Sequence, residues 1–80
     1  MSVYINKRTS VVTINLNKSF YNVNSIKQTV KDFSGVCSAS IKGNDRFEIT
    51  LKAKVNLDIY ILGYEFCNYL LALMKNENIV

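Results

Sequence analysis

Hydrophobic and polar residues alternate along three segments of the chain, which is the pattern of half-buried strands. In segment 11–16, Val12, Ile14 and Leu16 fall on one face. Segments 36–42 and 46–55 alternate in the same way, and Gly43-Asn44-Asp45 between them predicts a tight hairpin turn. The inward positions expected of these two strands are Cys37, Ala39, Ile41, Phe47, Ile49, Leu51, Ala53 and Val55.

The first ten residues contain another β-prone run, Val3-Tyr4-Ile5. It predicts either an edge strand that returns through a loose hairpin or a frayed N-terminal arm. We favour the edge strand.

Two segments have helical periodicity instead. Asn22 is a suitable cap for a helix that runs to about Phe33, and its apolar residues recur at spacings of three and four. Ser34-Gly35 is expected to end this helix, with the glycine in a left-handed conformation. The second helix covers roughly residues 57–76, and Asn56 or Asp58 is expected to cap it.

The predicted order β-α-β-β-α indicates an α+β fold, a two-layer sandwich with both helices on one face of the sheet. It is a ferredoxin-like split β-α-β arrangement that lacks its last strand. We expect strand 46–55 to lie beside strand 11–16 and parallel to it, with strand 36–42 outside. Residues 3–5 could then occupy the vacant edge.

The last helix carries two apolar stripes. At about 100° per residue, the first occupies an arc of roughly 100°, which is enough to pack on a sheet. The second stripe adjoins it, and together they cover about 220° of the helix circumference. The first stripe consists of Ile59, Leu62, Phe66, Tyr69, Leu70 and Leu73, and the second of Tyr60, Tyr64, Cys67, Leu71 and Met74.

Two interpretations of the second stripe stay open. The helix could be wedged between the sheet and the first helix, so that both stripes are buried. Alternatively, the second stripe could be an exposed surface for a partner or for a second copy in a homodimer, because tyrosine and methionine are enriched in interfaces. We favour the exposed surface, as a binding site for a protein or peptide partner. Strand addition by the partner at an open edge of the sheet is the other mode of binding that stays open.

Length and charge limit the function classes. Eighty residues predict one domain, 1–80, that buries only about 60–65% of its unfolded surface and is marginally stable. The net charge is +4 and the pI is near 9.2, but the basic residues are spread along the chain. An RNA- or anion-binding domain is the alternative function, and it would use Lys42, Arg46, Lys52 and Lys54.

The expected outer face of the sheet carries serine, threonine, lysine, arginine, glutamate and asparagine. Aromatic platforms for base stacking are missing from this set, which disfavours nucleic acid as a partner. A solvated face is the better interpretation.

The residue types disfavour an enzyme. With no histidine, histidine-dependent nucleophilic catalysis and histidine-bearing metal sites are excluded. Cys37 is expected in the core rather than as a reactive thiol, and no glycine-rich loop could hold a phosphate. We therefore expect no cofactor and no metal.

The sequence also indicates where in the cell the protein is expected. The two cysteines do not form a disulfide framework, and the N-terminus has no secretory pattern, so a cytoplasmic protein with reduced thiols is expected. The longest apolar stretch, Ile59 to Met74, is interrupted by Glu65 and Asn68, and we expect no membrane span.

Four blocks of the chain resemble a known family. They are Ile14-Asn-Leu-Asn17, Lys31-Asp-Phe-Ser-Gly-Val-Cys37, Phe47-Glu-Ile-Thr-Leu51 and Glu65-Phe-Cys-Asn-Tyr-Leu-Leu71, the last similar to a recurring Glu-Phe-x-Asn-x-Leu-Leu pattern. From Ile14 to Ile79 the chain resembles the His-Xaa-Ser system protein HxsD family, accessory proteins encoded with radical-SAM maturases. The resemblance implies a non-catalytic accessory role in peptide modification. The implied partners are a radical-SAM maturase or the His-Xaa-Ser substrate protein, and no functional residues are carried over.

Overall fold

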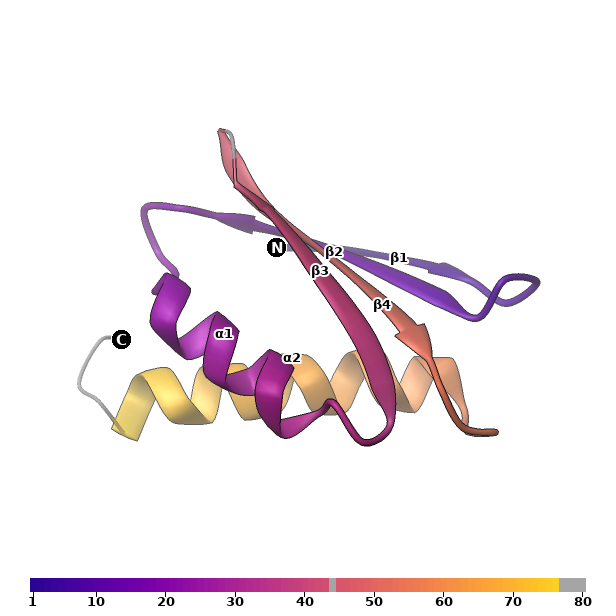
Figure 1. Cartoon of the computed structure of the whole chain (residues 1–80). Coiled ribbons are helices and arrows are strands. Elements are labelled where there is room, and N and C mark those ends of the chain that lie inside the picture. Colours follow the sequence, from indigo (N-terminus) through magenta and orange to yellow (C-terminus); the bar gives the residue numbers. More distant parts are fainter. Residues whose placement is uncertain (44, 77–80) are drawn as a thin grey trace.

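Two layers make up the computed structural model, which describes residues 1–43 and 45–76. A twisted four-stranded sheet forms one layer, and both helices lie on the same side of it (Figure 1). The α+β class and the two-layer sandwich predicted from the sequence are confirmed. The elements in chain order are β1 (Ser2–Asn6), β2 (Val11–Asn17), α1 (Val23–Asp32), β3 (Cys37–Gly43), β4 (Arg46–Ala53) and α2 (Ile59–Asn76).

The strands follow the order β1-β2-β4-β3, and every pair of neighbours is antiparallel. Because β2 and β3 both run antiparallel to β4, they are parallel to each other with β4 between them. The α1 helix connects them, which is the split β-α-β arrangement expected from the sequence. The predicted neighbours are confirmed, but the predicted parallel pairing of segments 11–16 and 46–55 is wrong. The β3–β4 hairpin reverses the chain, so only β3 can run parallel to β2.

The β1 strand occupies the vacant edge beside β2, as the favoured interpretation of residues 1–10 predicted. Its register runs from Ser2 opposite Asn15 to Asn6 opposite Val11. In the connecting turn the Thr9 N–H donates to Asn6 Oδ1 at 3.3 Å, and Ser10 has a left-handed backbone with φ 57°. The Ala53 N–H donates to the Ser10 carbonyl at 3.2 Å, which ties this turn to the end of β4.

The helix-facing side of the sheet forms the core. Alternation correctly predicted the inward faces of β2 and β4 as far as Ala53, but Val55 is 47% exposed and is not an inward residue. The strand ends at Ala53, so the alternation no longer decides which way Val55 points. The buried hydrophobic residues are Val12, Ile14, Leu16, Ile26, Cys37, Ile49, Leu51, Ile59, Leu62, Phe66, Cys67, Leu70 and Met74.

Asparagine and aspartate cap the two helices. Asn22 Oδ1 accepts from the N–H groups of Asn24 at 2.7 Å and Ser25 at 3.2 Å, as predicted for α1. Of the two candidates for α2, Asp58 is the cap, and its Oδ1 accepts from Tyr60 N–H at 2.9 Å and from Ile61 N–H at 3.4 Å.

The end of α1 differs from the prediction at Gly35, because no glycine among the described residues has a positive φ. The helix ends at Asp32 with Phe33 as its C-terminal cap. The Phe33 carbonyl then accepts from the N–H groups of Val36 and Cys37, both at 3.0 Å. These bonds close the turn into β3 without a left-handed residue.

Aromatic contacts join the two helices. The ring of Phe33, the C-terminal cap of α1, meets the Phe66 ring edge-on at a centroid distance of 5.2 Å, and the Tyr69 ring at 5.5 Å. The Tyr69 hydroxyl donates to Asp32 Oδ2, and Gln28 Nε2 donates to Asp32 Oδ1 at 2.8 Å. The α1-facing side of α2 is therefore the side that carries Phe66 and Tyr69.

Candidate partner-binding surface

Three of the five residues predicted to bind a partner project into solvent from one side of α2. Tyr60 is 50% exposed, Tyr64 67% and Leu71 38%. At about 100° per residue they fall within an arc of roughly 40°. Tyr60 and Tyr64 lie on adjacent turns, and Leu71 lies about two turns after Tyr64. We call these three residues the α2 stripe.

The other two predicted partner-binding residues, Cys67 and Met74, are buried in the core, so their placement on an exposed surface is wrong. Their relative exposures are 8% and 0%. Both lie on the margin of the second predicted stripe that adjoins the sheet-facing arc, roughly 40–60° closer to the core than Leu71. The helix is rotated so that the boundary between core and solvent divides the predicted stripe along its length.

Ile61 is an apolar residue of this surface that the sequence analysis missed. It is 59% exposed and belongs to neither predicted stripe. Its position lies roughly 60° from Tyr64 on the solvent side of the helix. A signal was present, because isoleucine outside both stripes cannot be explained by packing on the sheet.

Gly63 brings α2 close to β2, one of the two central strands of the sheet. A Cβ atom built at position 63 would lie 3.2 Å from Val12 Cγ1 on β2 and 3.9 Å from Val3 Cγ1 on β1. A methyl group here would be closer than ordinary van der Waals contact, so Val12 or the helix would have to shift by a few tenths of an ångström. The close approach also places α2 against β1, whose Val3 remains 42% exposed.

The α2 stripe lies on the side of the helix that faces away from α1. Tyr69, which contacts Phe33 at the end of α1, is roughly 160° around the helix from Leu71. Since β1 and β3 are the opposite edges of the sheet and α2 contacts β1, the stripe faces the β1 edge of the molecule. The Lys7 ammonium, directly after β1, confirms this placement, because it lies 5.5 Å from the centroid of the Tyr60 ring.

The four basic residues of the alternative function do not come together. Lys42 lies opposite Glu48 in the β3–β4 register. Lys52 is six residues from Arg46 along β4, a distance of about 20 Å. The Lys54 ammonium donates to the Ser34 carbonyl at 2.9 Å. This hydrogen bond joins the segment after β4 to the turn after α1.

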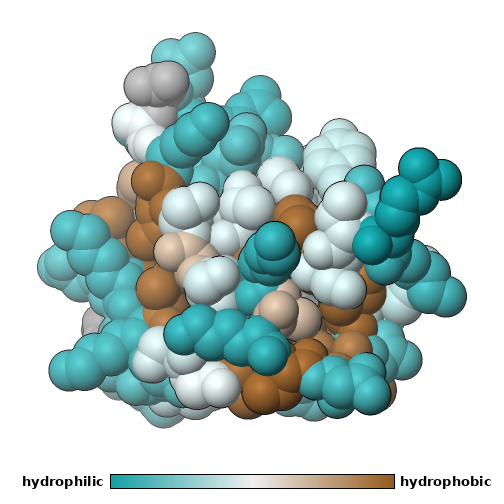
Figure 2. Space-filling model, turned by 45° about the vertical axis from the view of Figure 1, so that its right-hand side comes forward, coloured by the Kyte–Doolittle hydropathy of each residue, from teal (hydrophilic) through white to brown (hydrophobic). Residues whose placement is uncertain are grey.

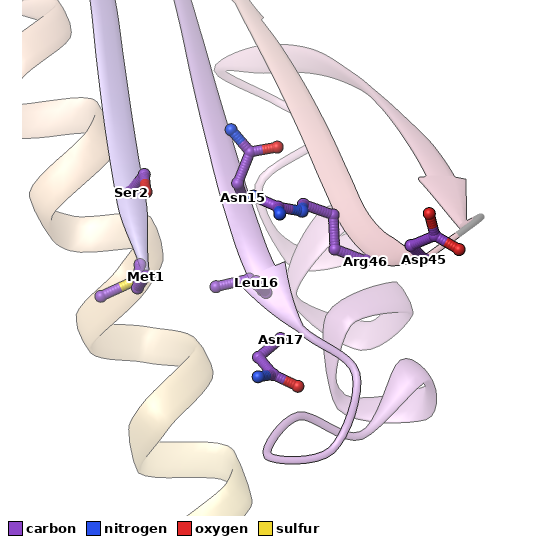
Figure 3. A pocket seen from close by; sticks show the side chains of 7 residues that line it. All are labelled: Met1, Ser2, Asn15, Leu16, Asn17, Asp45 and Arg46. Carbon is purple, nitrogen blue, oxygen red and sulfur yellow. The ribbon is translucent and has the colours of Figure 1, made fainter.

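Arg46 lies at a small polar hollow near the end of the sheet (Figure 3). Its side chain extends from the start of β4 toward Asn15 on β2, and Asp45 also lines the hollow. The acid offsets the positive charge of Arg46, and the other three basic residues do not contribute. The hollow therefore does not assemble the predicted anion site.

In the described part of the chain, both helices lie on one side of the sheet and leave its outer face uncovered (Figure 1). A row across this face reads Tyr4, Thr13, Thr50 and Ser40 by strand register. Tyr4 is 63% exposed, which corrects the prediction that this face lacks aromatic side chains. It is a single aromatic on the edge strand rather than a central stacking platform.

On the side of the molecule drawn in Figure 2, hydrophobic residues gather along the lower margin, and the centre is mostly of intermediate hydropathy.

Both thiols are buried and free. Burial raises the pKa of the Cys37 thiol, partly opposed by the charge of Lys54. Burial also raises the pKa of Cys67, partly opposed by the positive amino terminus. A raised pKa lowers the fraction of reactive thiolate. In residues 1–43 and 45–76, histidine, cysteine and acidic side chains form no group of three that could hold a metal.

No family model matches this chain, and neither a curated protein nor a solved structure matches it. The resemblance to the HxsD family therefore stays a prediction. Within the described part of the chain, neither helix is long and apolar enough to cross a membrane.

Proposed function

We propose that this chain is a non-catalytic accessory protein that binds a protein or peptide partner through the α2 stripe. Following the family resemblance, the system is a cytoplasmic His-Xaa-Ser radical-SAM peptide-modification system, and the partner is its maturase or its substrate protein. The observation that carries the proposal is the exposure of Tyr60, Tyr64 and Leu71 together on one side of α2.

Single exposed apolar residues are ordinary on protein surfaces, whereas contiguous apolar surface is typical of interaction sites. The three residues of the α2 stripe share one narrow arc, and Ile61 widens it. Tyrosine suits such a surface, because its ring provides contact area while its hydroxyl remains hydrated in the unbound state.

A binding role also agrees with the chemistry of the chain. The sequence contains no histidine, and both thiols are buried with raised pKa values. The charged groups nearest the α2 stripe are Lys7, Asp58 and Lys75. Lys7 and Asp58 line one hollow with Tyr60, where the Asp58 carboxylate caps the helix by accepting from the Tyr60 N–H. Recognition is thus the activity that these residues support best.

The test is a binding measurement with the purified maturase and the purified His-Xaa-Ser substrate protein as separate partners. We expect Tyr64→Asp combined with Leu71→Asp to weaken binding by on the order of a hundredfold, because two charges would enter an apolar contact. Both positions are exposed, so thermal unfolding of the free protein should change little.

The matched control is Asn24→Asp combined with Ser34→Asp, which adds two acids at exposed positions on α1 and in the turn after it, on the side of the molecule away from the stripe. This control should bind like the wild type. Equal binding by both double variants would reject the α2 stripe as the contact surface. If Tyr64→Asp with Leu71→Asp unfolds the free protein, the stripe belongs to the core and the proposal is wrong.

A further inference from the structure

The two edges of the sheet differ in how they are protected. Natural edge strands are usually blunted by lysine, proline or a bulge. The β3 edge carries Lys42, and the Gly43 carbonyl at its end accepts from Lys18 Nζ at 2.7 Å. The β1 strand, Ser-Val-Tyr-Ile-Asn, has no charged residue and no proline, and its register with β2 runs without a bulge. Alternate backbone N–H and C=O groups of β1 therefore face outward, ready to pair with another strand.

The α2 stripe lies below this same edge. A fifth strand beside β1 would direct every second side chain toward the helix layer, because side chains alternate between the two faces of a sheet. Those side chains would meet Val3 and the exposed rings of Tyr60 and Tyr64, which are now in contact with water. The backbone of β1 and the apolar side of α2 thus form one continuous binding surface.

Charge indicates what kind of segment fits there. Lys7 and Arg8 follow β1 in the turn, and Lys7 lies over the Tyr60 ring. Lys75 lies one turn beyond Leu71 on the same side of α2, at the other end of the stripe.

Asp58 lines the same hollow as Lys7 and Tyr60, but its carboxylate already accepts from the N–H groups of Tyr60 and Ile61. Lys7 and Arg8 outnumber this acid, so the net charge is positive at both ends of the apolar surface.

A second copy of the chain is a poor occupant for this surface. Two β1 strands paired about a twofold axis would run antiparallel, so the Lys7 end of one protomer would approach the Lys75 end of its partner. Like charges would then meet at both ends of the interface. An acidic segment has the complementary charge at both ends.

Building on the function proposed above, we propose that the partner presents an extended peptide in which acidic and apolar residues alternate. This peptide adds a fifth strand to the free edge of β1 and packs its apolar side chains on the α2 stripe. Main-chain hydrogen bonds supply affinity in this mode of recognition, and the alternate side chains supply specificity. Lys7, Arg8 and Lys75 select acidic over basic sequences.

The test uses two synthetic octapeptides, one alternating glutamate with valine and the other alternating lysine with valine. At low salt we expect the glutamate peptide to bind on the order of tenfold more tightly, with amide resonance shifts concentrated in Ser2–Asn6. Methylation of the interior backbone nitrogens of the glutamate peptide should abolish binding, because it removes the donors for strand pairing.

Charge reversal provides the matched protein variants. Lys7→Glu with Lys75→Glu should remove the preference for the glutamate peptide. Lys27→Glu with Lys31→Glu changes the net charge by the same amount at exposed positions on α1 and should keep the preference. If both double variants lose it equally, net charge rather than this surface selects the peptide, and the proposal is overturned.

Other outcomes would also overturn it. Equal affinity for the two octapeptides would reject charge selection, and shifts confined to β3 would place strand addition at the other edge. A concentration-dependent dimer that excludes the glutamate peptide would assign the edge to a second copy. If these occur while Tyr64→Asp with Leu71→Asp still disrupts binding of a partner, the strand-addition proposal fails and the proposed function survives.

Discussion

Gly63 on α2 lies so close to Val12 on β2 that a Cβ atom at position 63 would be 3.2 Å from Val12 Cγ1. Val12 is fully buried between neighbouring strands and has little room to move. The contact therefore determines how closely the long helix approaches the sheet.

The first prediction concerns Gly63→Ala. Alanine gains about 1 kcal/mol of helix propensity over glycine, but overpacking a well-packed contact costs about 1–3 kcal/mol. We expect a net loss of about 1 kcal/mol in the free energy of unfolding, measured with urea. A double-mutant cycle with Val12→Ala should show coupling, because the smaller side chain removes the collision. Additive losses would mean that Val12 is not what resists the methyl group.

The second prediction separates core from surface within the predicted second stripe. Met74 is fully buried, so Met74→Ala should lower the free energy of unfolding by about 2–5 kcal/mol. Leu71 is 38% exposed, and Leu71→Ala should cost less than about 1 kcal/mol. Equal losses in urea unfolding would contradict the division of the stripe at this position.

The third prediction concerns the cap of α1. Asn22→Ala removes the acceptor for the N–H groups of Asn24 and Ser25, and should lower the free energy of unfolding by about 1 kcal/mol. Asn22→Asp keeps an acceptor at the same place and should retain most of the stability. If both variants lose the same amount, the cap's side-chain oxygen is not the stabilising group.

The fourth prediction concerns pH and the hydroxyl of Tyr69. Its hydrogen bond to Asp32 raises the pKa of Tyr69, with burial and the charge of Asp32 acting in the same direction. The protonated phenol is thus favoured in the folded state. Its contribution to stability is fully present below the unfolded tyrosine pKa of about 10 and is lost as pH rises through the folded value.

Urea unfolding of the wild type and Tyr69→Phe between pH 8 and about pH 11 tests this, because the difference between them isolates Tyr69 from the other titrating groups. We expect the stability advantage of the wild type to shrink at the alkaline end. A difference that stays constant with pH would show that the hydrogen bond to Asp32 does not control the ionisation.

The fifth prediction concerns the two thiols. Cys37 and Cys67 are buried, and burial raises the pKa of each, so an aromatic disulfide reagent should label them slowly in the folded protein. In denaturing urea both should react rapidly. Fast labelling of one thiol in the folded state, located by mass spectrometry, would show that its part of the core opens readily.

The sequence was informative about the fold wherever one local pattern had one physical cause. Alternation predicted the strands because each buries one face, and Asn22 predicted a cap because its side chain replaces a missing helical acceptor. It was uninformative about Val55, since alternation does not encode where a strand ends. The direction of β4 relative to β2 could have been derived, because a hairpin must reverse the chain.

The binding surface was predictable only in part, because it depends on the rotation of α2 about its axis. Periodicity identified Tyr60, Tyr64 and Leu71, but the packing of Gly63 on Val12 determines that Met74 is buried. The role of Lys7 beside the Tyr60 ring depends on where β1 pairs, and no pattern within either segment encodes that contact.

The pairing of β1 with β2 completes the sheet of a ferredoxin-like fold with the elements in a different chain order. The strand that would follow the last helix in that order is supplied here from before β2, and it runs in the direction that the missing strand would take. The molecule is therefore equivalent to a circular permutation of the full split β-α-β fold. A chain that starts at Val11 and carries Ser2–Asn6 on a short linker after α2 should rebuild the same sheet.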